Sequence, residues 1–308
     1  MNKWVLGARP RTLPAAIAPV VVASALAGPD FNWFRATLAL NVGVWLQIGV
    51  NFANDYSDGI KGTDDDRVGP IRLVASGIAT AKSVKGAAFI SFAIACIAGA
   101  WLAFLTSPLL IIVGAISIAA AWGYTGGKNP YGYKGLGDIS VFIFFGVIAT
   151  VGTFYVQSET ITLLSFIVSI PMGVLSCAIL AINNLRDRPK DELANKLTLA
   201  VRIGDTKARY MYVSLLAIAH IAAIATLIPT ALLTLLLLPM SISISSQVLR
   251  GASGKDLVPV LGRTGKLQLI FSIVFAVGLA IQLFHVTGSS THLGLWFNNL
   301  CVNRLCPY

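Results

Sequence analysis

Residues 36–58 read ATLALNVGVWLQIGVNFANDYSD and change character within the length of one helix. The part from 36 to 54 is almost entirely apolar and is close to the roughly 20 residues that a helix needs to cross a lipid core. Asn and Asp side chains then emerge at its end, and ionisable residues that enter a membrane span are candidates for function. The stretch therefore predicts a membrane-spanning helix that ends at a polar site.

The composition of the whole chain agrees with this interpretation. Its 308 residues are 56% hydrophobic and 12% charged, with a mean hydropathy of +0.77. Ordinary soluble domains have about 45–50% apolar and about 25% charged residues. The composition excludes soluble, disordered and fibrous classes. The four cysteines lack the spacing of a zinc site and are interpreted as small apolar residues.

Polar residues, glycines and prolines divide the chain into nine apolar segments. They cover residues 13–28, 36–54, 84–105, 108–124, 139–157, 160–182, 211–228, 231–249 and 267–287. The predicted fold class is an all-α membrane protein with nine transmembrane helices enclosing a central cavity. Residues 1–287 form a single transmembrane domain on this interpretation, and the C-terminal tail at 288–308 is given no role.

Basic residues are distributed unevenly among the predicted loops. All Lys and Arg except Arg35 and Arg304 lie before the first span or in the loops after the second, fourth, sixth and eighth spans, with Lys85, at the start of the third span, counted in the loop before it. Because Lys and Arg accumulate on the cytoplasmic side of a membrane, we expect an integral plasma-membrane protein with a cytoplasmic N-terminus and an external C-terminus. The net charge of +10 then reflects topology, and no nucleic-acid partner is expected.

Two polar clusters follow predicted spans on the basic side. In the first, at 47–77, the residues that share one helix face are Asn51, Asn54 or Asp55, and Asp58. In the second, at 181–205, the residues repeated every four positions are Asn183, Asp187 and Asp191. Carboxylates four residues apart on a helix repel each other unless a cation lies between them. The two clusters therefore predict a site that binds a cation.

Magnesium suits such a site, because it prefers hard oxygen ligands and completes its shell with water and phosphate oxygens. The basic residues around both clusters that could hold those phosphates are Lys61, Arg67, Arg72, Arg186, Arg188 and Lys190. We therefore predict a diphosphate site. The alternative is that the acids are solvated loop charges, which fits Asp64, Asp65 and Asp66 better than the other acids.

A third polar stretch, WGYTGGKNPYGYKGLGDIS, occupies residues 122–140. Its glycines and proline are typical of turns, and its tyrosines are typical of anchors at a membrane surface. The loop also falls on the acid-rich side and brings Lys128 near several ring hydroxyls. The residues alone leave open whether it is a connector or part of a pocket for an aromatic substrate.

The chain resembles the UbiA superfamily of intramembrane aromatic prenyltransferases over about residues 3–287. The motifs that carry the resemblance are Asn54-Asp55-x-x-Asp58, Tyr124-x-x-x-Lys128 and Asp187-x-x-x-Asp191. The stretches most similar to the branch that prenylates 1,4-dihydroxy-2-naphthoate in menaquinone synthesis are RPRTLP, NDYSDGIKGTD, GPIRLVASG, YTGGKNPYGYKGLGD and NNLRDRPKDELANKLTLAVRIG. One position departs from the general pattern: Gly62 stands where an acid is usual, so either Asp64 or no third acid completes the first motif.

The resemblance implies an active site at the cytoplasmic side and a Mg2+-dependent reaction. A polyprenyl group would pass from polyprenyl diphosphate to 1,4-dihydroxy-2-naphthoate with loss of CO2 and diphosphate, giving demethylmenaquinone. The implied metal ligands are Asn54, Asp58, Asp187 and Asp191, and the implied catalytic residues are Asp58, Asp187, Asp191 and Lys128. The diphosphate-binding residues would be Lys61, Arg67, Arg72 and Arg186. The residues for the aromatic substrate would be Tyr124, Lys128, Tyr131, Arg9 and Arg11.

Two other functions fit the same residues. One is prenyl transfer to another aromatic acceptor, 4-hydroxybenzoate or homogentisate, at the same diphosphate site. The other is a membrane transporter, because polar breaks in spans also mark substrate paths. Transporter sites tend to lie near the bilayer midplane, whereas these acids lie at one face. Membrane lipid is an expected contact in every case.

Overall fold

The computed structural model describes residues 2–62 and 71–288, and every regular element within them is a helix. The α-helices are α1 (Lys3–Ala8), α2 (Pro14–Leu26), α3 (Trp33–Lys61), α4 (Ala81–Leu105), α5 (Leu109–Gly123), α6 (Gly137–Val141), α7 (Ala149–Ser158), α8 (Leu163–Leu193), α9 (Leu199–Ile203), α10 (Asp205–Ile224), α11 (Leu238–Leu249) and α12 (Leu257–Gly288). The other elements are 3-10 helices η1 (Pro10–Thr12), η2 (Gly28–Asp30), η3 (Tyr131–Lys134), η5 (Pro229–Leu237) and η6 (Gly254–Asp256), and a π-helix, η4 (Phe142–Ile148).

Six helical segments in the described ranges are long and apolar enough to cross a membrane, and the chain is an integral membrane protein. They are Trp33–Lys61, Ala81–Leu105, Gly137–Ser158, Leu163–Leu193, Pro229–Leu249 and Gly254–Leu283. The predicted spans at 13–28, 108–124 and 211–228 form α2, α5 and α10, which are not among these six. The helices α2 and α5 have only 13 and 15 residues. Nine crossings therefore stay a prediction.

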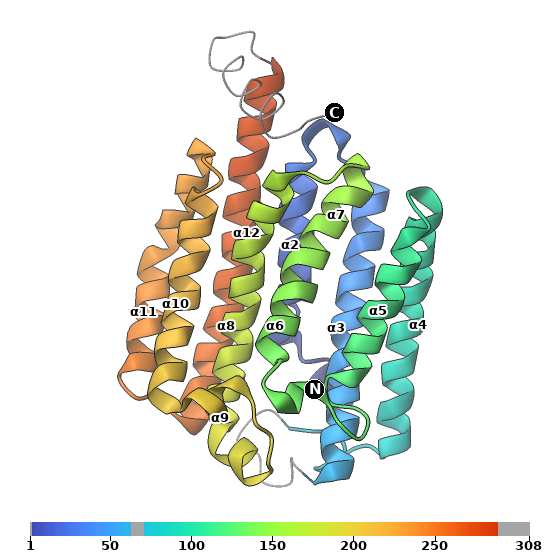
Figure 1. The fold of residues 1–308 in the computed structure, drawn as a ribbon, viewed down its shortest axis with the longest axis vertical. Helices are drawn as coiled ribbons and strands as arrows, with labels where there is room; N and C mark the ends of the chain where they lie inside the picture. The colour runs from blue at the N-terminus through green and yellow to red at the C-terminus, as the bar shows by residue number, and fades with distance from the viewer. Residues whose placement is uncertain (1, 63–70, 289–308) are drawn as a thin grey trace.

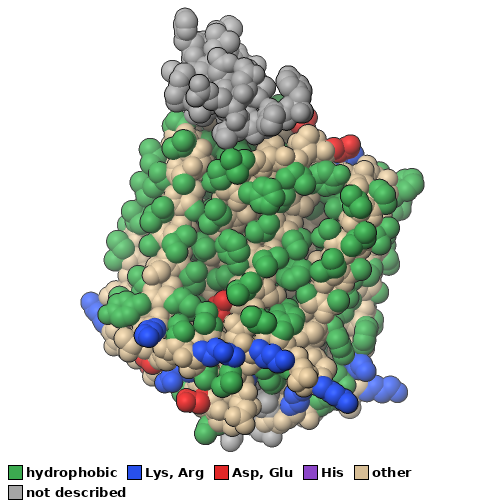
Figure 2. Space-filling view, viewed as in Figure 1, with side chains coloured by type: hydrophobic (Ala, Val, Ile, Leu, Met, Phe, Trp, Pro, Cys, Tyr) green, Lys and Arg blue, Asp and Glu red, His purple; other side chains and the backbone are tan. Residues whose placement is uncertain are grey.

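The longer helices run side by side along a common direction, with α4 and α5 at one edge and α10 and α11 at the other (Figure 1). Figure 2 shows hydrophobic side chains over the body of the visible face and Lys and Arg side chains gathered at one end. This is the end at which α3 and α8 finish and α9 lies (Figure 1). The last turns of α3 and α8, which carry the acid motifs, therefore lie at the same end of the molecule.

Local sequence signals begin and end these two helices. Asn32 caps α3 by accepting from the backbone N–H groups of Phe34 and Arg35, and Thr162 and Ser165 form a capping box at the start of α8. The helix α3 ends at Gly62, whose φ of 70° suits a residue without a side chain. The sequence thereby fixes where each acid motif leaves its helix.

The helix α8 is the most central element, packing against α2, α10, α12 and η4. Its contact with η4 is close, because a Cβ added at Gly146 would lie 2.6 Å from the Cα of Gly173. Glycine at both positions lets the π-helix approach α8 backbone to backbone. One wall of the interior is thereby held against the helix that carries the second acid motif.

Candidate active site

A cavity of about 310 Å³ lies among these helices. Its polar end is lined by Asp58 of α3, by Asp187 and Asp191 of α8, and by the cations Arg72 and Lys196. The side chains that line its apolar end and form a buried cluster of their own are Val20, Ala39, Leu102 and Val156. Asp58 and Ala39 lie about 28 Å apart along α3 at about 1.5 Å per residue, so the cavity extends along most of the bundle.

Asp58 is the meeting point of three separate parts of the chain. Its side chain is 1% exposed, and its Oδ1 accepts a hydrogen bond from Tyr133 Oη at 2.7 Å. Arg72 Nη2 donates to Oδ2 at 3.4 Å, and Lys196 Nζ lies 3.8 Å from the same oxygen. Two cations and a phenol thus surround this one carboxylate.

Lys196 joins the two acid clusters, and it is absent from the residues predicted from the sequence. Its Nζ lies 3.8 Å from Asp58 Oδ2 and 3.6 Å from Asp191 Oδ1. The chain turns back after α8 through Asn195, which has a φ of 52°, and the N–H of Lys196 donates to the carbonyl of Asp191 at 2.7 Å. An ammonium thus lies between two carboxylates that were expected to share a metal ion.

The oxygen donors at this end suit a magnesium ion. Asn54, Asp58, Asp187 and Asp191 all line the cavity, and Mg2+ prefers such hard ligands. In the described part of the chain, no three His, Cys, Asp or Glu side chains lie close enough to form a metal site by themselves. Mg2+ is usually held by one or two carboxylates together with substrate phosphates and water, so the donor set fits.

Arg186 lies behind this end and does not line the cavity. Its Nε and Nη2 donate to Asp187 Oδ1 and Oδ2 at 2.8 and 2.7 Å, a two-bond pairing that fixes the plane of the carboxylate. The Arg186 side chain is fully buried. The geometry gives it contact with Asp187, whereas the sequence predicts contact with diphosphate.

Asp55 differs from Asp58 of the same motif, because it bonds to the protein backbone. It is fully buried, and its two carboxylate oxygens accept the backbone N–H groups of Leu73 and Val74 at 2.9 and 3.0 Å. These bonds attach the segment after the undescribed residues 63–70 to the side of α3. Arg72, next in the chain to Leu73, is thereby held beside Asp58.

We expect Asp55→Asn to lower the melting temperature in detergent, because an amide nitrogen would face one of the two N–H donors. A buried donor left without a partner costs about 1–3 kcal/mol. The affinity for the diphosphate that the sequence predicts should fall as well, because Arg72 loses its anchor. Thermal unfolding and equilibrium binding of inorganic diphosphate test this. An unchanged melting temperature would show that the two backbone bonds are dispensable.

The loop at 122–140 is attached to α3 through Thr125. Thr125 Oγ1 donates to Asn54 Oδ1 at 2.7 Å, and its carbonyl accepts from Lys61 Nζ at 2.8 Å. Lys61 is exposed, lies 4.9 Å from the ring centroid of Tyr133, and does not line the cavity. Its contacts hold the loop in place beside the first acid motif.

Tyr124 and Tyr131 both line the cavity from this loop. Tyr131 Oη donates to the carbonyl of Ala120 at 2.9 Å, and burial raises the pKa of Tyr131, which keeps the hydroxyl protonated. A Cβ at Gly137 would lie 2.8 Å from Tyr124 Oη, so glycine there makes room for the phenol. The sequence leaves open whether this loop is a connector or part of a pocket, and the structure places these two rings at the cavity.

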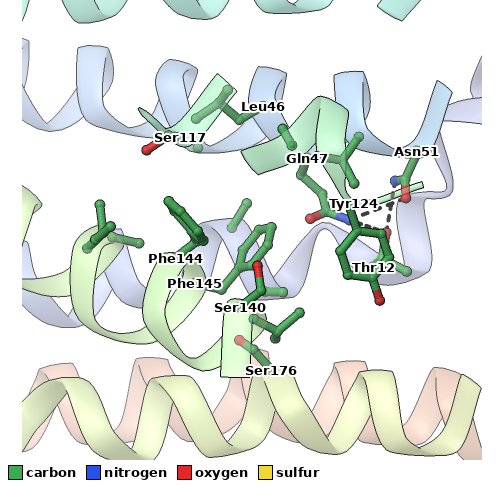
Figure 3. Close-up of a pocket in the computed structure, with 18 of the residues that line it drawn as sticks. Thr12, Leu46, Gln47, Asn51, Ser117, Tyr124, Ser140, Phe144, Phe145 and Ser176 are labelled. Carbon is green, nitrogen blue, oxygen red and sulfur yellow. Dashed lines mark hydrogen bonds between the residues drawn. The ribbon is translucent and has the colours of Figure 1, made fainter. Parts of the chain in front are cut away.

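The N-terminal arm forms the neighbouring wall. Arg9, with a φ of 52°, lines the cavity, and its carbonyl accepts a bond from Thr12 Oγ1 at 3.0 Å. Thr12 in turn contacts Gln47 and Asn51 of α3 (Figure 3), and these three side chains line the same cavity as Tyr124. Gln47 and Thr12 were not predicted, although a glutamine one turn before Asn51 in an apolar span was a usable signal.

The structure does not bring every predicted residue to the cavity. Lys128 is exposed in its turn and Arg11 is exposed on η1, and neither lines the cavity. Arg67 and Asp64 lie outside the described residues. Lys128, which the resemblance implies for the aromatic substrate, follows Gly126 and Gly127 and lies at the surface, whereas Tyr124 of the same motif lines the cavity.

Known proteins similar to this chain were found by sequence. A model of the UbiA prenyltransferase family matches residues 16–258. The 1,4-dihydroxy-2-naphthoate octaprenyltransferase of Mycobacterium tuberculosis is 49% identical over 282 residues, covering 90% of this chain and 97% of that protein. The protein of the same name from Escherichia coli is 37% identical over 295 residues, covering 91% and 95%.

Solved structures show the same helical fold. The UbiA homologue from Archaeoglobus fulgidus bound to GPP and Mg2+ has a TM-score of 0.64 at 13% identity, covering 91% of this chain and 100% of that one. The apo UbiA homologue from Aeropyrum pernix also has a TM-score of 0.64, at 17% identity, covering 88% and 97%.

Proposed function

This chain belongs to the UbiA prenyltransferase family and is a membrane prenyltransferase, and from that premise we propose that it prenylates 1,4-dihydroxy-2-naphthoate. The donor would be a polyprenyl diphosphate. Diphosphate and CO2 would be released, and the product would be demethylmenaquinone in its hydroquinone form. The names of the Mycobacterium tuberculosis and Escherichia coli relatives support this choice of acceptor.

One observation carries the proposal: the acids of two distant motifs line one cavity together with two cations. Asp58 comes from α3 and Asp187 and Asp191 from α8, and Arg72 and Lys196 lie among them. Acids suited to a metal and bases suited to phosphate meet where an apolar cavity begins. A substrate with a charged head and a long apolar tail matches that arrangement.

The residues that would hold Mg2+ are Asn54, Asp58, Asp187 and Asp191. When bound, the ion supplies neutralisation of the charge that develops on the leaving diphosphate. Arg72 and Lys196 would bind diphosphate oxygens directly, with Lys196 exchanging its contacts to Asp58 and Asp191 for contacts to the substrate. Arg186 would keep Asp187 oriented through its two hydrogen bonds.

The remaining chemistry concerns the prenyl carbon and the ring. The bond between prenyl C1 and the diphosphate oxygen breaks, and C1 bonds to a ring carbon. The ring carboxyl leaves as CO2, and the electron pair of its bond stays with the ring. The apolar walls exclude water from the allylic centre, which would otherwise be hydrolysed. Arg9, Tyr124 and Tyr131 are the lining residues that would orient the acceptor.

The placement in the membrane is part of the proposal. We propose nine crossings within a single domain at 1–287, with the N-terminus and the active site on the cytoplasmic side of the plasma membrane. The gathering of Lys and Arg at the end that holds the acids supports this orientation (Figure 2). The tail at 288–308 lies largely outside the described residues and is given no role.

Mass spectrometry of reaction products tests the function. Purified protein would receive Mg2+, octaprenyl diphosphate and 1,4-dihydroxy-2-naphthoate, with 4-hydroxybenzoate in a parallel reaction. We expect a prenylated naphthoquinone that lacks the carboxyl group. Prenylated hydroxybenzoate instead would reject the acceptor while keeping the diphosphate site. No product with either acceptor, together with uptake of unaltered substrate into sealed vesicles, would favour a transporter.

A further inference from the structure

A polar wall of three side chains lies inside the cavity, away from the acids. Gln47 and Asn51 project from α3 toward Thr12 of η1, and all three line the cavity (Figure 3). Gln47 and Asn51 are 8% and 3% exposed and Thr12 is 8% exposed. Neutral polar groups this deeply buried need hydrogen-bond partners. The direction of each bond therefore determines which donor or acceptor atom remains for a ligand in the cavity.

The hydrogen bonds of this wall run in one direction. Thr12 Oγ1 donates to the carbonyl of Arg9 at 3.0 Å, which leaves its lone pairs to accept from Gln47 Nε2 at 3.2 Å and Asn51 Nδ2 at 3.1 Å. Asn51 Nδ2 also donates to the carbonyl of Ala8 at 2.9 Å. The backbone carbonyls of Ala8 and Arg9 can only accept, so Asn51 Nδ2 and Thr12 Oγ1 must be the donors to them. With the Asn51 amide oriented in this way, its Oδ1 is the atom that accepts from Gln47.

The orientation of the Gln47 amide follows from these contacts. Its Nε2 donates to both Thr12 Oγ1 and Asn51 Oδ1, at 3.2 and 3.4 Å. A flipped amide would set its carbonyl oxygen against Asn51 Oδ1 and lose both bonds. Both N–H groups are thus committed, and Figure 3 shows the Gln47 oxygen on the side away from Thr12 and Asn51. Gln47 Oε1 is therefore a hydrogen-bond acceptor that faces the cavity.

We infer that Gln47 Oε1 accepts a hydrogen bond from a ring hydroxyl of the aromatic acceptor and makes Gln47 a specificity-determining residue. The inference rests on the proposed function and adds the group that recognises a hydroxyl. Arg9 lines the same wall. A ring that carries a carboxylate and a hydroxyl would therefore meet a cation for the carboxylate and a hydrogen-bond acceptor for the hydroxyl. An aromatic substrate without that hydroxyl would leave the Gln47 carbonyl without a hydrogen-bond donor in a site that excludes water.

Equilibrium binding tests the inference without turnover. Dissociation constants would be measured for 1,4-dihydroxy-2-naphthoate and for 1-hydroxy-2-naphthoate and 4-hydroxy-2-naphthoate, each of which lacks one of its two hydroxyls. The wild-type protein should bind one of the two monohydroxy compounds about tenfold or more weakly than the dihydroxy compound. In Gln47→Met, which keeps the side-chain length but has no carbonyl, that ratio should fall to within about twofold of unity.

Two further variants separate recognition from folding. Thr12→Val leaves Gln47 in place but removes the acceptor that fixes its amide, so the ratio should fall to an intermediate value. Ser117→Ala removes a cavity-lining hydroxyl that donates to its own helix at Val113, and the wild-type ratio should be kept. A Gln47→Met or Thr12→Val protein that keeps the full wild-type ratio would overturn the inference.

The wild-type protein distinguishes this inference from the proposed function. Prenyl transfer to 1,4-dihydroxy-2-naphthoate together with equal affinity for all three naphthoates would refute the role of Gln47 and leave the function intact. Absence of binding to every naphthoate and absence of prenyl transfer would refute both.

Discussion

Asp58→Asn is expected to lower kcat/KM for prenyl transfer on the order of 10³-fold at saturating Mg2+. The variant keeps the size of the side chain, and its amide oxygen can still accept from Tyr133 Oη, so the fold should hold. What it removes is one negative charge beside Arg72 and Lys196, at the place where a metal and a diphosphate would meet. Steady-state kinetics across a Mg2+ titration and thermal unfolding measure the two effects separately.

Glu192→Gln is the matched control for Asp58→Asn. Glu192 follows Asp191 in the second motif, is exposed, and pairs with Arg188 at 3.6 Å outside the cavity. An exposed pair of this kind contributes little, so activity should stay within about twofold of wild type. Near-normal activity of Asp58→Asn would contradict the site as described.

Lys196→Met is expected to lower kcat/KM about 10²-fold, because it removes a cation that we propose binds diphosphate. The half-saturating Mg2+ concentration should also fall, which means that the metal ion binds more tightly. The Lys196 ammonium lies between Asp58 and Asp191, so a metal ion held by these two carboxylates has to displace it. Without the ammonium, the two carboxylates attract a divalent ion more strongly.

Lys190→Met tests whether any lysine near the second motif would behave in this way. Lys190 lies on α8 but does not line the cavity, and its replacement should change neither kcat/KM nor the Mg2+ requirement by more than about twofold. A higher Mg2+ requirement in Lys196→Met would show that Lys196 assists the metal ion and does not compete with it.

The long apolar helices could be predicted because they are marked in the sequence by apolar length and by their ends. The span expected at 36–54 is α3, and the one expected at 139–157 is the continuous run Gly137–Ser158. Hydropathy could not find the π-helix at Phe142–Ile148. That element depends on the close approach of Gly146 to Gly173, a contact between two helices that no local pattern records.

The candidate site was only partly predictable, for reasons that particular residues make clear. Spacing on a helix brings Asp187 and Asp191 to one face, and both line the cavity. Spacing cannot follow the chain beyond a helix end, so the turn at Asn195 that returns Lys196 to Asp191 was missed. The same limit explains Lys128, whose position is set by a loop. Helical spacing allowed Asp55 to share the face of Asn51 and Asp58, but its carboxylate bonds to the backbone of Leu73 and Val74.

The cavity is charged at one end and apolar at the other, and this asymmetry bears on how the reaction relates to membrane voltage. The charged side chains that line it are Arg9, Asp58, Arg72, Asp187, Asp191 and Lys196, and its far end is Val20, Ala39, Leu102 and Val156. On the proposed function, diphosphate would bind and leave at the charged end, and the prenyl chain that occupies the apolar end would be uncharged. Moving one elementary charge through 100 mV involves about 2.3 kcal/mol, and we expect no such transfer during turnover. Turnover should proceed at the same rate in an energised and a depolarised membrane.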